Sequence, residues 1–344
     1  MCEETAEFTT IAGPRERVEW LMAHWEGLRL PTDEPLYERG IRLRWYDLAE
    51  LGDAYRERDC GAVAVALHPS GEAVRTAASI TAALDLAGEF RLRCEPGHTF
   101  AGAAGPGGGG ARLDPQQVAR ARPLVPALPK RTGSRVAVLD TGVDSAPNAL
   151  VDVTKGWPVG GQPVADPHGH GSAVTQAIRA VTPHADVVPI RVLDATNKGS
   201  SQAIYQGLIA ALWDAQGCDV VNASFGVDAT ASCGTALGHT FRYLMTLRQQ
   251  SRHLGQPPAL VVAAGNNRTS LRSPATADGA YVVPATDLTG AKATYCRNLV
   301  LGAGIRSYPA PGGEKADPLG TYGTGGGIYG TSFAAGFVSG ALLA

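Results

Sequence analysis

The sequence is poor in charge. Charged residues make up 18% of the 344 positions, and the formal net charge is −2. Proteins that bind nucleic acid mainly through electrostatics carry a clear excess of Lys and Arg, so this balance argues against a nucleic-acid partner. The near-neutral total conceals an asymmetry, because residues 1–114 hold 12 basic against 19 acidic residues and residues 115–344 hold 18 against 13.

Long apolar runs are also missing. No run approaches the roughly 18 residues that a membrane span needs. The first residues, "MCEETAEFTT", contain neither the basic segment nor the apolar segment of a secretory signal. The six cysteines are scattered without a CxxC pair, which is typical of reduced thiols. These absences predict a cytoplasmic protein with no membrane partner, and a gene start further upstream would overturn that prediction.

Apolar residues and glycine are abundant. Hydrophobic residues make up 44% of the chain and glycine occurs 43 times, which predicts a large core with many tight turns. The segment "AGAAGPGGGGAR", residues 101–112, has almost no side chains to bury and is typical of a flexible linker. We therefore expect a small N-terminal domain over residues 1–100, a Gly-rich linker over 101–117 and a second domain over 118–344.

The N-terminal region alternates between helical and strand patterns. "PRERVEWLMAHWEGL" and "GEAVRTAASITAALDLAG" have the periodicity of helices, and "GIRLRWY", "GAVAVALH" and "EFRLRC" are typical of short strands. This alternation predicts a small α/β or α+β domain. It contains no recognisable chemical motif, and we expect His68 and His98 to be structural.

Beyond the linker, apolar strands alternate with helices. The strands are "RVAVLD", "ADVVPIRVL", "DVVNASF" and "ALVVAA", and "SSQAIYQGLIAALWDAQG" is an expected helix with Ile204, Leu208 and Leu212 on one face. This pattern predicts an α/β fold with a mainly parallel, twisted sheet and helices on both faces. Because ligands of such sheets bind beyond the carboxyl ends of the strands, the residues after each strand are candidate site residues.

Four polar residues stand at such ends or at helix starts. Asp140 closes "RVAVLD", His170 opens a helix in "DPHGHGSAV", Asn266 follows "ALVVAAG", and Ser332 opens the helix "SFAAGFVSGALL". Each has a structural alternative: an Asx-turn, a turn histidine, a turn asparagine and a helix N-cap. A metal site using His168 and His170 is disfavoured, since Asp166 alone does not complete a ligand set.

Five segments along the chain contain these residues or lie between them: "VAVLDTGVD", "GHGSAV", "VVNASFG", "VVAAGN" and "GTSFAAGFVSGA". In order and spacing they resemble the signatures of the subtilisin-like serine proteases, the subtilases. The resemblance covers roughly residues 133–344. It implies a catalytic triad in which Ser332 is the nucleophile, His170 the general base and Asp140 the residue that orients His170. It also implies that Asn266 and the backbone N–H of Ser332 form the oxyanion hole, and it assigns substrate binding to five further residues: Ser224, Phe225, Gly226, Ala264 and Gly265.

The implied function is a hydrolase, a serine endopeptidase that acts on peptides or proteins through an acyl-enzyme. The small, uncharged pocket residues favour an apolar or medium-sized residue before the cleaved bond, unless Asp278 points into that pocket. No cofactor is predicted. Many subtilases bind calcium, but no cluster of acids in this sequence identifies such a site. The competing hypotheses are a catalytically silent subtilase fold that binds peptides and an esterase, which the missing Gly-x-Ser-x-Gly motif disfavours.

The match departs from the family pattern in three places. Ser172 and Ala173 follow the histidine where a threonine and a second histidine are usual, and the serine is followed by Phe333 and not Met. The chain also stops twelve residues after Ser332, where subtilases normally continue, so the expected peptidase domain is truncated at its C-terminus if the sequence is a fragment, or else the protein is unusually trimmed.

The role of residues 1–100 has two explanations. They form either an inhibitory propeptide, docked within the same chain and cut in the linker, or a recognition module that targets the protease. The opposite charges of the two parts would steer such docking.

Overall fold

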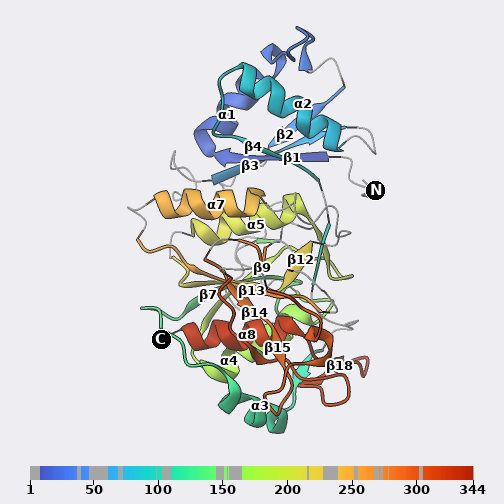
Figure 1. The fold of residues 1–344 in the computed structure, drawn as a ribbon, viewed down its shortest axis with the longest axis vertical. Coiled ribbons are helices and arrows are strands. Elements are labelled where there is room, and N and C mark those ends of the chain that lie inside the picture. The colour runs from blue at the N-terminus through green and yellow to red at the C-terminus, as the bar shows by residue number, and fades with distance from the viewer. Residues whose placement is uncertain are drawn as a thin grey trace. The chain divides into compact units, whose positions relative to one another are not determined.

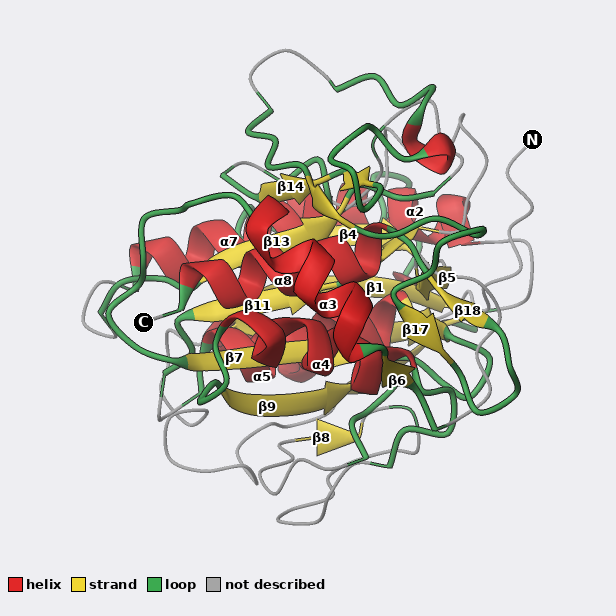
Figure 2. Cartoon of the chain, turned by 90° about the horizontal axis from the view of Figure 1, so that it is seen from below, coloured by secondary structure: helices red, strands yellow, loops and turns green. Residues whose placement is uncertain are grey.

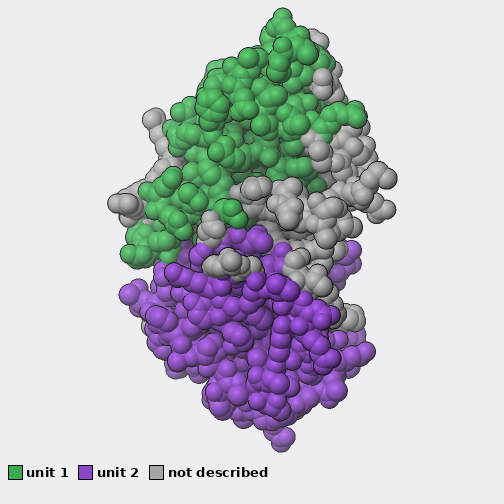
Figure 3. Space-filling view, viewed as in Figure 1, with its two compact units in different colours: residues 1–99, 200–215, 228–257 green, residues 100–199, 216–227, 258–344 purple. Residues whose placement is uncertain are grey.

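The structure is a computed structural model in which two compact units are distinguished (Figure 3). Unit 1 holds residues 1–99, 200–215 and 228–257, and unit 2 holds residues 100–199, 216–227 and 258–344. The structure describes residues 8–36, 40–45, 61–68, 73–97, 99–102, 110–144, 151–152, 154, 165–214, 217–227, 239–251, 255–266, 271, 274–277, 279–301 and 305–343.

The N-terminal part of unit 1 is a four-stranded antiparallel sheet with two helices. Its elements are β1 (Phe8–Pro14), α1 (Arg15–His24), β2 (Arg42–Trp45), β3 (Gly61–Leu67), α2 (Ala73–Leu86) and β4 (Arg93–Pro96), with a 3₁₀ turn η1 (Trp25–Gly27) after α1. The strand order β2-β3-β1-β4 is that of a split βαβ, ferredoxin-like fold. The region is therefore α+β, and β1 is a strand that the sequence patterns did not predict.

A continuous core joins this sheet to α1 and α2 (Figure 1). Ile11 of β1, Leu21 of α1, Ala64 of β3 and Ile80 of α2 are all fully buried in it. His68 is also buried, and its imidazole lies 3.3 Å from the Thr9 hydroxyl, so it has a structural contact as expected. His98 lies outside the described residues.

Two further helices of unit 1, α5 (Ser201–Leu212) and α7 (His239–Gln250), contact β1, β3 and β4 (Figure 1). The packing is tight at Gly61, where an added Cβ would lie 3.0 Å from the Trp213 ring. The prediction that α5 has a single apolar face is wrong. Its buried residues extend around the helix and include Tyr205 and Gln206 as well as Ile204 and Leu208.

Unit 2 is built on a six-stranded sheet in the order β14-β13-β11-β7-β9-β8, and every adjacent pair is parallel. The strands are β7 (Arg135–Asp140), β8 (Val151–Asp152), β9 (Asp186–Arg191), β11 (Val220–Ala223), β13 (Ala259–Ala263) and β14 (Tyr281–Val283). α4 (His170–Val181) and α8 (Thr331–Leu342) lie together on one face (Figure 2). The predicted mainly parallel sheet with helices is thus confirmed.

Small elements surround this sheet in unit 2. They are β5 (Thr99–Gly102), β6 (Arg112–Leu113), α3 (Pro115–Ala121), η5 (Arg122–Leu124), β10 (Lys198–Ser200), β12 (Phe225–Val227), β15 (Ala285–Thr286), η7 (Thr294–Cys296), β16 (Ala310–Pro311), β17 (Gly320–Thr321) and β18 (Gly327–Ile328). The expected linker, 101–117, thus contains strand residues near both ends, while residues 103–109 lie outside the described part. No helix among the described residues has the length and apolarity that a bilayer crossing requires.

Candidate active site

Asp140 is the last residue of β7, the strand at which the order of strand addition reverses. From β7 the chain builds β8 and β9 on one side and β11, β13 and β14 on the other, so the carboxyl end of β7 is the topological switch point. Asp140 is 1% exposed, and its Oδ1 accepts a hydrogen bond from the backbone N–H of Thr141 at 2.7 Å. A strand end thus presents a buried carboxylate where this fold class binds ligands.

His170 is the first residue of α4 and contacts this carboxylate. Its Nδ1 lies 2.6 Å from Asp140 Oδ1, and the imidazole is fully buried. Close approach of the two elements depends on Gly171, because a Cβ there would lie 2.1 Å from the Gly142 carbonyl oxygen. Gly169, in the left-handed region at φ 87°, turns the chain into the helix. The flanking glycines therefore bring the two side chains together.

Asp166 is a second buried acid beside this pair. Its Oδ1 accepts from the Thr141 hydroxyl and from Gly169 N, both at 2.7 Å, and its Oδ2 accepts from Ser172 N at 2.7 Å. Burial raises the pKa of Asp166, and nearby Asp140 raises this pKa further. From the sequence, Asp166 was considered only in rejecting a metal site. The signal for its observed role, accepting from the first N–H groups of the helix, was the position of an acid just before a helix start.

Thr141 connects the two acids. Its hydroxyl donates to Asp166, lies 3.2 Å from Asp140 Oδ1 and accepts from Gly171 N at 3.0 Å. The result is a buried network that fixes the backbone on both sides of the Asp140–His170 contact.

The described residues contain no group of His, Cys, Asp and Glu arranged to hold a metal ion. The rings of His168 and His170 lie edge to face, with centroids 6.1 Å apart. Burial lowers the pKa of His168, and neighbouring His170 lowers this pKa further. The histidine pair is therefore a ring contact in this structure.

Ser332 is the second residue of α8 and is fully buried. Its hydroxyl donates to the Ser224 carbonyl at 3.1 Å, and the Ser224 hydroxyl donates to Asn222 Oδ1 at 2.8 Å. The Asn222 amide in turn donates to the hydroxyl of Ser339, about two turns further along α8, at 2.9 Å. Asn222 and Ser339 were not singled out from the sequence, because nothing local connects a strand residue with a helix residue 117 positions away.

The imidazole of His170 has one side engaged by Asp140. Its Nε2 is buried and has no hydrogen-bond partner among the described residues. The Phe333 ring packs beside it, with ring centroids 5.5 Å apart. The Asp140–His170 contact and the Ser332–Ser224 contact are thus both present in unit 2, and Ser332 donates to a carbonyl oxygen in this arrangement.

Asn266 follows β13, and its side chain contacts the first residue of α8. Its Oδ1 accepts from the backbone N–H of Thr331 at 3.0 Å and lies 3.1 Å from the Thr331 hydroxyl. The Thr331 hydroxyl also accepts from Gly265 N at 3.1 Å. These contacts tie the end of β13, with Ala264 and Gly265, to the residue before Ser332.

The strand expected to bind substrate already has a neighbour. Phe225 and Gly226 belong to β12, which pairs antiparallel with Phe100–Gly102 of β5. On the other side of β5, Gly102 N donates to the Asn197 carbonyl at 3.1 Å. The chain thus lays three of its own residues beside the expected substrate strand, while Asp278 lies outside the described residues.

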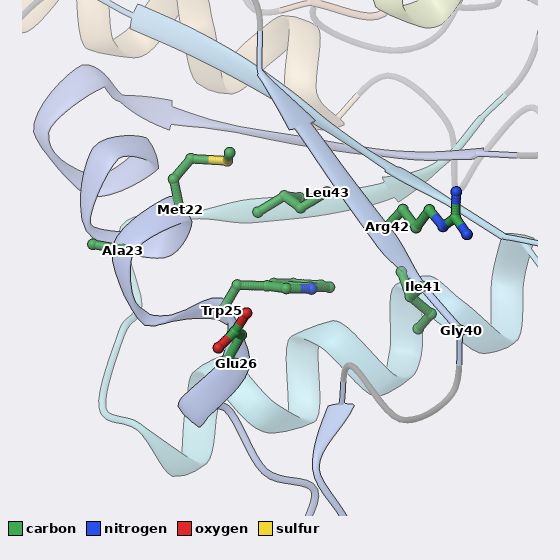
Figure 4. A pocket seen from close by; sticks show the side chains of 8 residues that line it. All are labelled: Met22, Ala23, Trp25, Glu26, Gly40, Ile41, Arg42 and Leu43. Atoms are coloured by element: carbon green, nitrogen blue, oxygen red, sulfur yellow. The ribbon is translucent and has the colours of Figure 1, made fainter.

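A separate cavity of about 580 Å³ lies in the N-terminal part of unit 1 (Figure 4). The close-up shows the Trp25 ring within it, between residues of α1 and the start of β2. None of the residues proposed for the active site lines it. Its lining residues are Met22, Ala23, Trp25, Glu26, Gly40, Ile41, Arg42 and Leu43.

Comparison with known proteins identifies several relatives of this chain. Among curated proteins, alkaline elastase YaB of Bacillus sp. (strain YaB) is 32% identical over 193 residues, 53% of this chain and 46% of the elastase. Subtilisin Savinase of Lederbergia lenta is 31% identical over 223 residues, 61% of this chain and 75% of that protein. The chain spans about half the length of the first of these curated relatives.

Among solved structures, the epidermin leader peptide processing serine protease of Staphylococcus aureus has the same fold. It superposes with a TM-score of 0.57 and 17% identity, covering 98% of this chain and 88% of that one. The profile of the subtilase family, peptidase family S8, matches residues 131–344, which include every residue assigned above to the site except those of β5. The chain therefore belongs to the subtilase family.

Proposed function

We propose that the chain is a serine endopeptidase in which Asp140, His170 and Ser332 form the catalytic triad. The observation that carries the proposal is the buried contact of 2.6 Å between Asp140 Oδ1 and His170 Nδ1, at the switch point of the sheet. The curated relatives, named as proteases and an elastase, support the reaction class.

In the proposed mechanism, His170 acts as the general base. With Nδ1–H donating to Asp140, the lone pair of the imidazole lies on Nε2, which can take the proton of Ser332. Ser332 Oγ then attacks the carbonyl carbon of the substrate, and Asp140 stabilises the imidazolium that forms. His170 returns the proton to the leaving amine, and water hydrolyses the acyl-enzyme by the same two proton transfers in sequence. In this scheme the Ser332 hydroxyl turns from the Ser224 carbonyl to His170.

The developing oxyanion is stabilised by donors at the start of α8. Since Asn266 Oδ1 accepts from Thr331, the Asn266 amide nitrogen is the end of that side chain that can donate to substrate. The backbone N–H of Ser332, at the N-terminus of a helix, is the second donor. Substrate adds as a strand along Ser224, Phe225 and Gly226, with Ala264 and Gly265 on the opposite side, so backbone hydrogen bonds supply affinity.

We further propose that the N-terminal part acts as an intramolecular inhibitor of the propeptide type. Two observations favour this over a recognition module. Residues Phe100–Gly102 pair with β12, where a substrate strand is expected. Within unit 1, Glu95 of β4 accepts hydrogen bonds from Tyr205 of α5 and Thr240 of α7, so the N-terminal sheet is bonded to helices of the C-terminal half of the chain.

Two measurements on the full chain test these proposals. A fluorophosphonate probe should label Ser332 once the linker has been cut by an added protease, and the Ser332→Ala variant treated in the same way should take up none; a cut, folded chain that stays unlabelled supports the silent peptide-binding module. Intact masses followed over time should show a cut in the Gly-rich linker that Ser332→Ala lacks. A cut that appears equally in both proteins contradicts self-processing, and an uncut, fully active chain favours the recognition module.

A further inference from the structure

Gly102 lies in the position of a substrate residue and is held from both sides. In the antiparallel register it faces Phe225 of β12, and its backbone N–H donates to the Asn197 carbonyl at 3.1 Å. β5 thus lies between β12 and β10 as the central strand of three. Strand addition binds a peptide by the same pairing on both sides. The contacts of β5 therefore indicate which side chains the site can accept at each position of a bound peptide.

The space beside Gly102 is filled by Asn197. A Cβ added to Gly102 would lie 2.2 Å from Asn197 Oδ1, 2.3 Å from its Nδ2 and 2.5 Å from its Cγ. Gly102 is not one of the glycines with positive φ among the described residues, so its backbone does not require glycine. Space, and not backbone conformation, therefore favours glycine at this position, and the three atoms nearest to the added Cβ all belong to the Asn197 side chain.

The backbone of Asn197 is fixed by its own contacts, and its side chain is largely buried beside Gly102. It is 7% exposed, and its backbone occupies the left-handed region at φ 62°, with its N–H donating to the Asp194 carbonyl at 3.0 Å. Its Oδ1 is buried and has no hydrogen-bond partner in the part of the chain that the structure describes. This oxygen is also the atom that lies nearest to the position a Cβ on Gly102 would take.

The neighbouring positions of β5 fix the strand and give it a direction. Phe100, two residues before Gly102 and on the same face of the strand, is fully buried and packs edge-on against Phe225 with ring centroids 5.6 Å apart. Ser224 precedes Phe225, and its carbonyl accepts from the Ser332 hydroxyl. Because the strands are antiparallel, a bound chain runs past its glycine toward Ser224 and the nucleophile.

We propose that Asn197 makes this peptidase select glycine as the second residue before the cleaved bond. The inference rests on the proposed function for the cleavage itself. Asn197 is here a specificity-determining residue that excludes a side chain. Excluding one methyl group in this way is worth on the order of 10- to 100-fold in discrimination.

The test is a cycle of variants at positions 102 and 197 in the full chain. Gly102→Ala introduces the excluded methyl group, and Asn197→Gly removes the excluding side chain at a position whose positive φ suits glycine. Ala195→Gly, at an exposed residue of the same loop, is the matched control for added flexibility. The first readout is hydrogen exchange of the β5 amides in the Ser332→Ala background, which needs no catalysis. The second is the rate of linker cleavage with Ser332 present.

We expect Gly102→Ala to speed exchange of the β5 amides, and to slow linker cleavage, by about 10-fold or more. Adding Asn197→Gly should bring both rates back to within about 3-fold of the parent, and adding Ala195→Gly should not. The proposal is overturned if Gly102→Ala leaves exchange unchanged, if Asn197→Gly fails to restore it, or if Ala195→Gly restores it equally.

The two readouts separate this proposal from the function on which it rests. If exchange follows the expected cycle while no variant cuts the linker or labels with a fluorophosphonate, glycine selection stands and the peptidase activity fails. If labelling and cleavage occur but are indifferent to position 102, the selection by Asn197 fails alone.

Discussion

The carboxylate of Glu95 is expected to be a major contributor to the stability of unit 1. Glu95 lies on β4 and is 2% exposed. Its Oε1 accepts from the Tyr205 hydroxyl at 3.0 Å, and its Oε2 accepts from the backbone N–H of Thr240, the second residue of α7, at 3.1 Å. It therefore places a negative charge at the start of one helix and bonds to the middle of another. Burial raises the pKa of Tyr205 and the Glu95 charge raises it further, so this tyrosine stays a donor.

Glu95→Ala leaves two buried donors without their acceptor. Tyr205 and Thr240 are both fully buried, and each donor left unsatisfied costs about 1–3 kcal/mol. We therefore expect the free energy of unfolding of unit 1 to fall by about 3–5 kcal/mol. Tyr205→Phe removes one of the two donors, so the cost of Glu95→Ala measured in that background should be smaller by about 1–2 kcal/mol.

Urea unfolding followed by tryptophan fluorescence measures this change. Four of the five tryptophans belong to unit 1, namely Trp20, Trp25, Trp45 and Trp213, so the signal reports mainly on this unit. The Ser332→Ala background prevents self-cleavage, and Glu26→Ala, at an exposed residue, is the control that should change stability by less than about 0.5 kcal/mol. A Glu95→Ala chain as stable as this control would refute the reasoning.

Three further predictions concern other parts of the molecule. Asn266→Ala should lower kcat about 100- to 1000-fold with little change in KM, as steady-state kinetics would reveal; an unchanged kcat removes Asn266 from the oxyanion hole. Ser339→Ala leaves the buried Asn222 amide without its acceptor, so it should cost about 1–3 kcal/mol in chemical unfolding and slow fluorophosphonate labelling of Ser332, whereas Ser339→Thr should retain the bond. Desolvation of the partly buried Cys94 raises the pKa of its thiol to about 12, so iodoacetamide at pH 8 should alkylate this thiol at least about 30-fold more slowly in the native chain than in urea, and equal rates in peptide mass analysis would contradict this pKa shift.

The sequence was most informative where structure is local. Short apolar runs bounded by glycine and polar residues predicted where several elements begin and end. They are the end of β7 at Asp140, the helix starts at His170 and Ser332, and the end of β13 before Asn266. The pattern failed at β1, whose Thr9 and Thr10 are polar residues that are fully buried. It also failed at α5, which is buried around its circumference, because periodicity predicts one buried face and does not count the neighbours that arrive from elsewhere in the chain.

The sequence by itself determined the family, the fold class of the C-terminal part and the identity and order of the candidate catalytic residues, since each of these is written in a contiguous motif. Only the tertiary structure decided which residues support them. Asp166 accepts a hydrogen bond from the first turn of α4, and Glu95 accepts one from Thr240, 145 positions away. Phe100–Gly102 pair with β12. The physical reason is that a hydrogen bond or a steric exclusion acts between neighbours in space, and chain separation leaves no local pattern from which such neighbours can be identified.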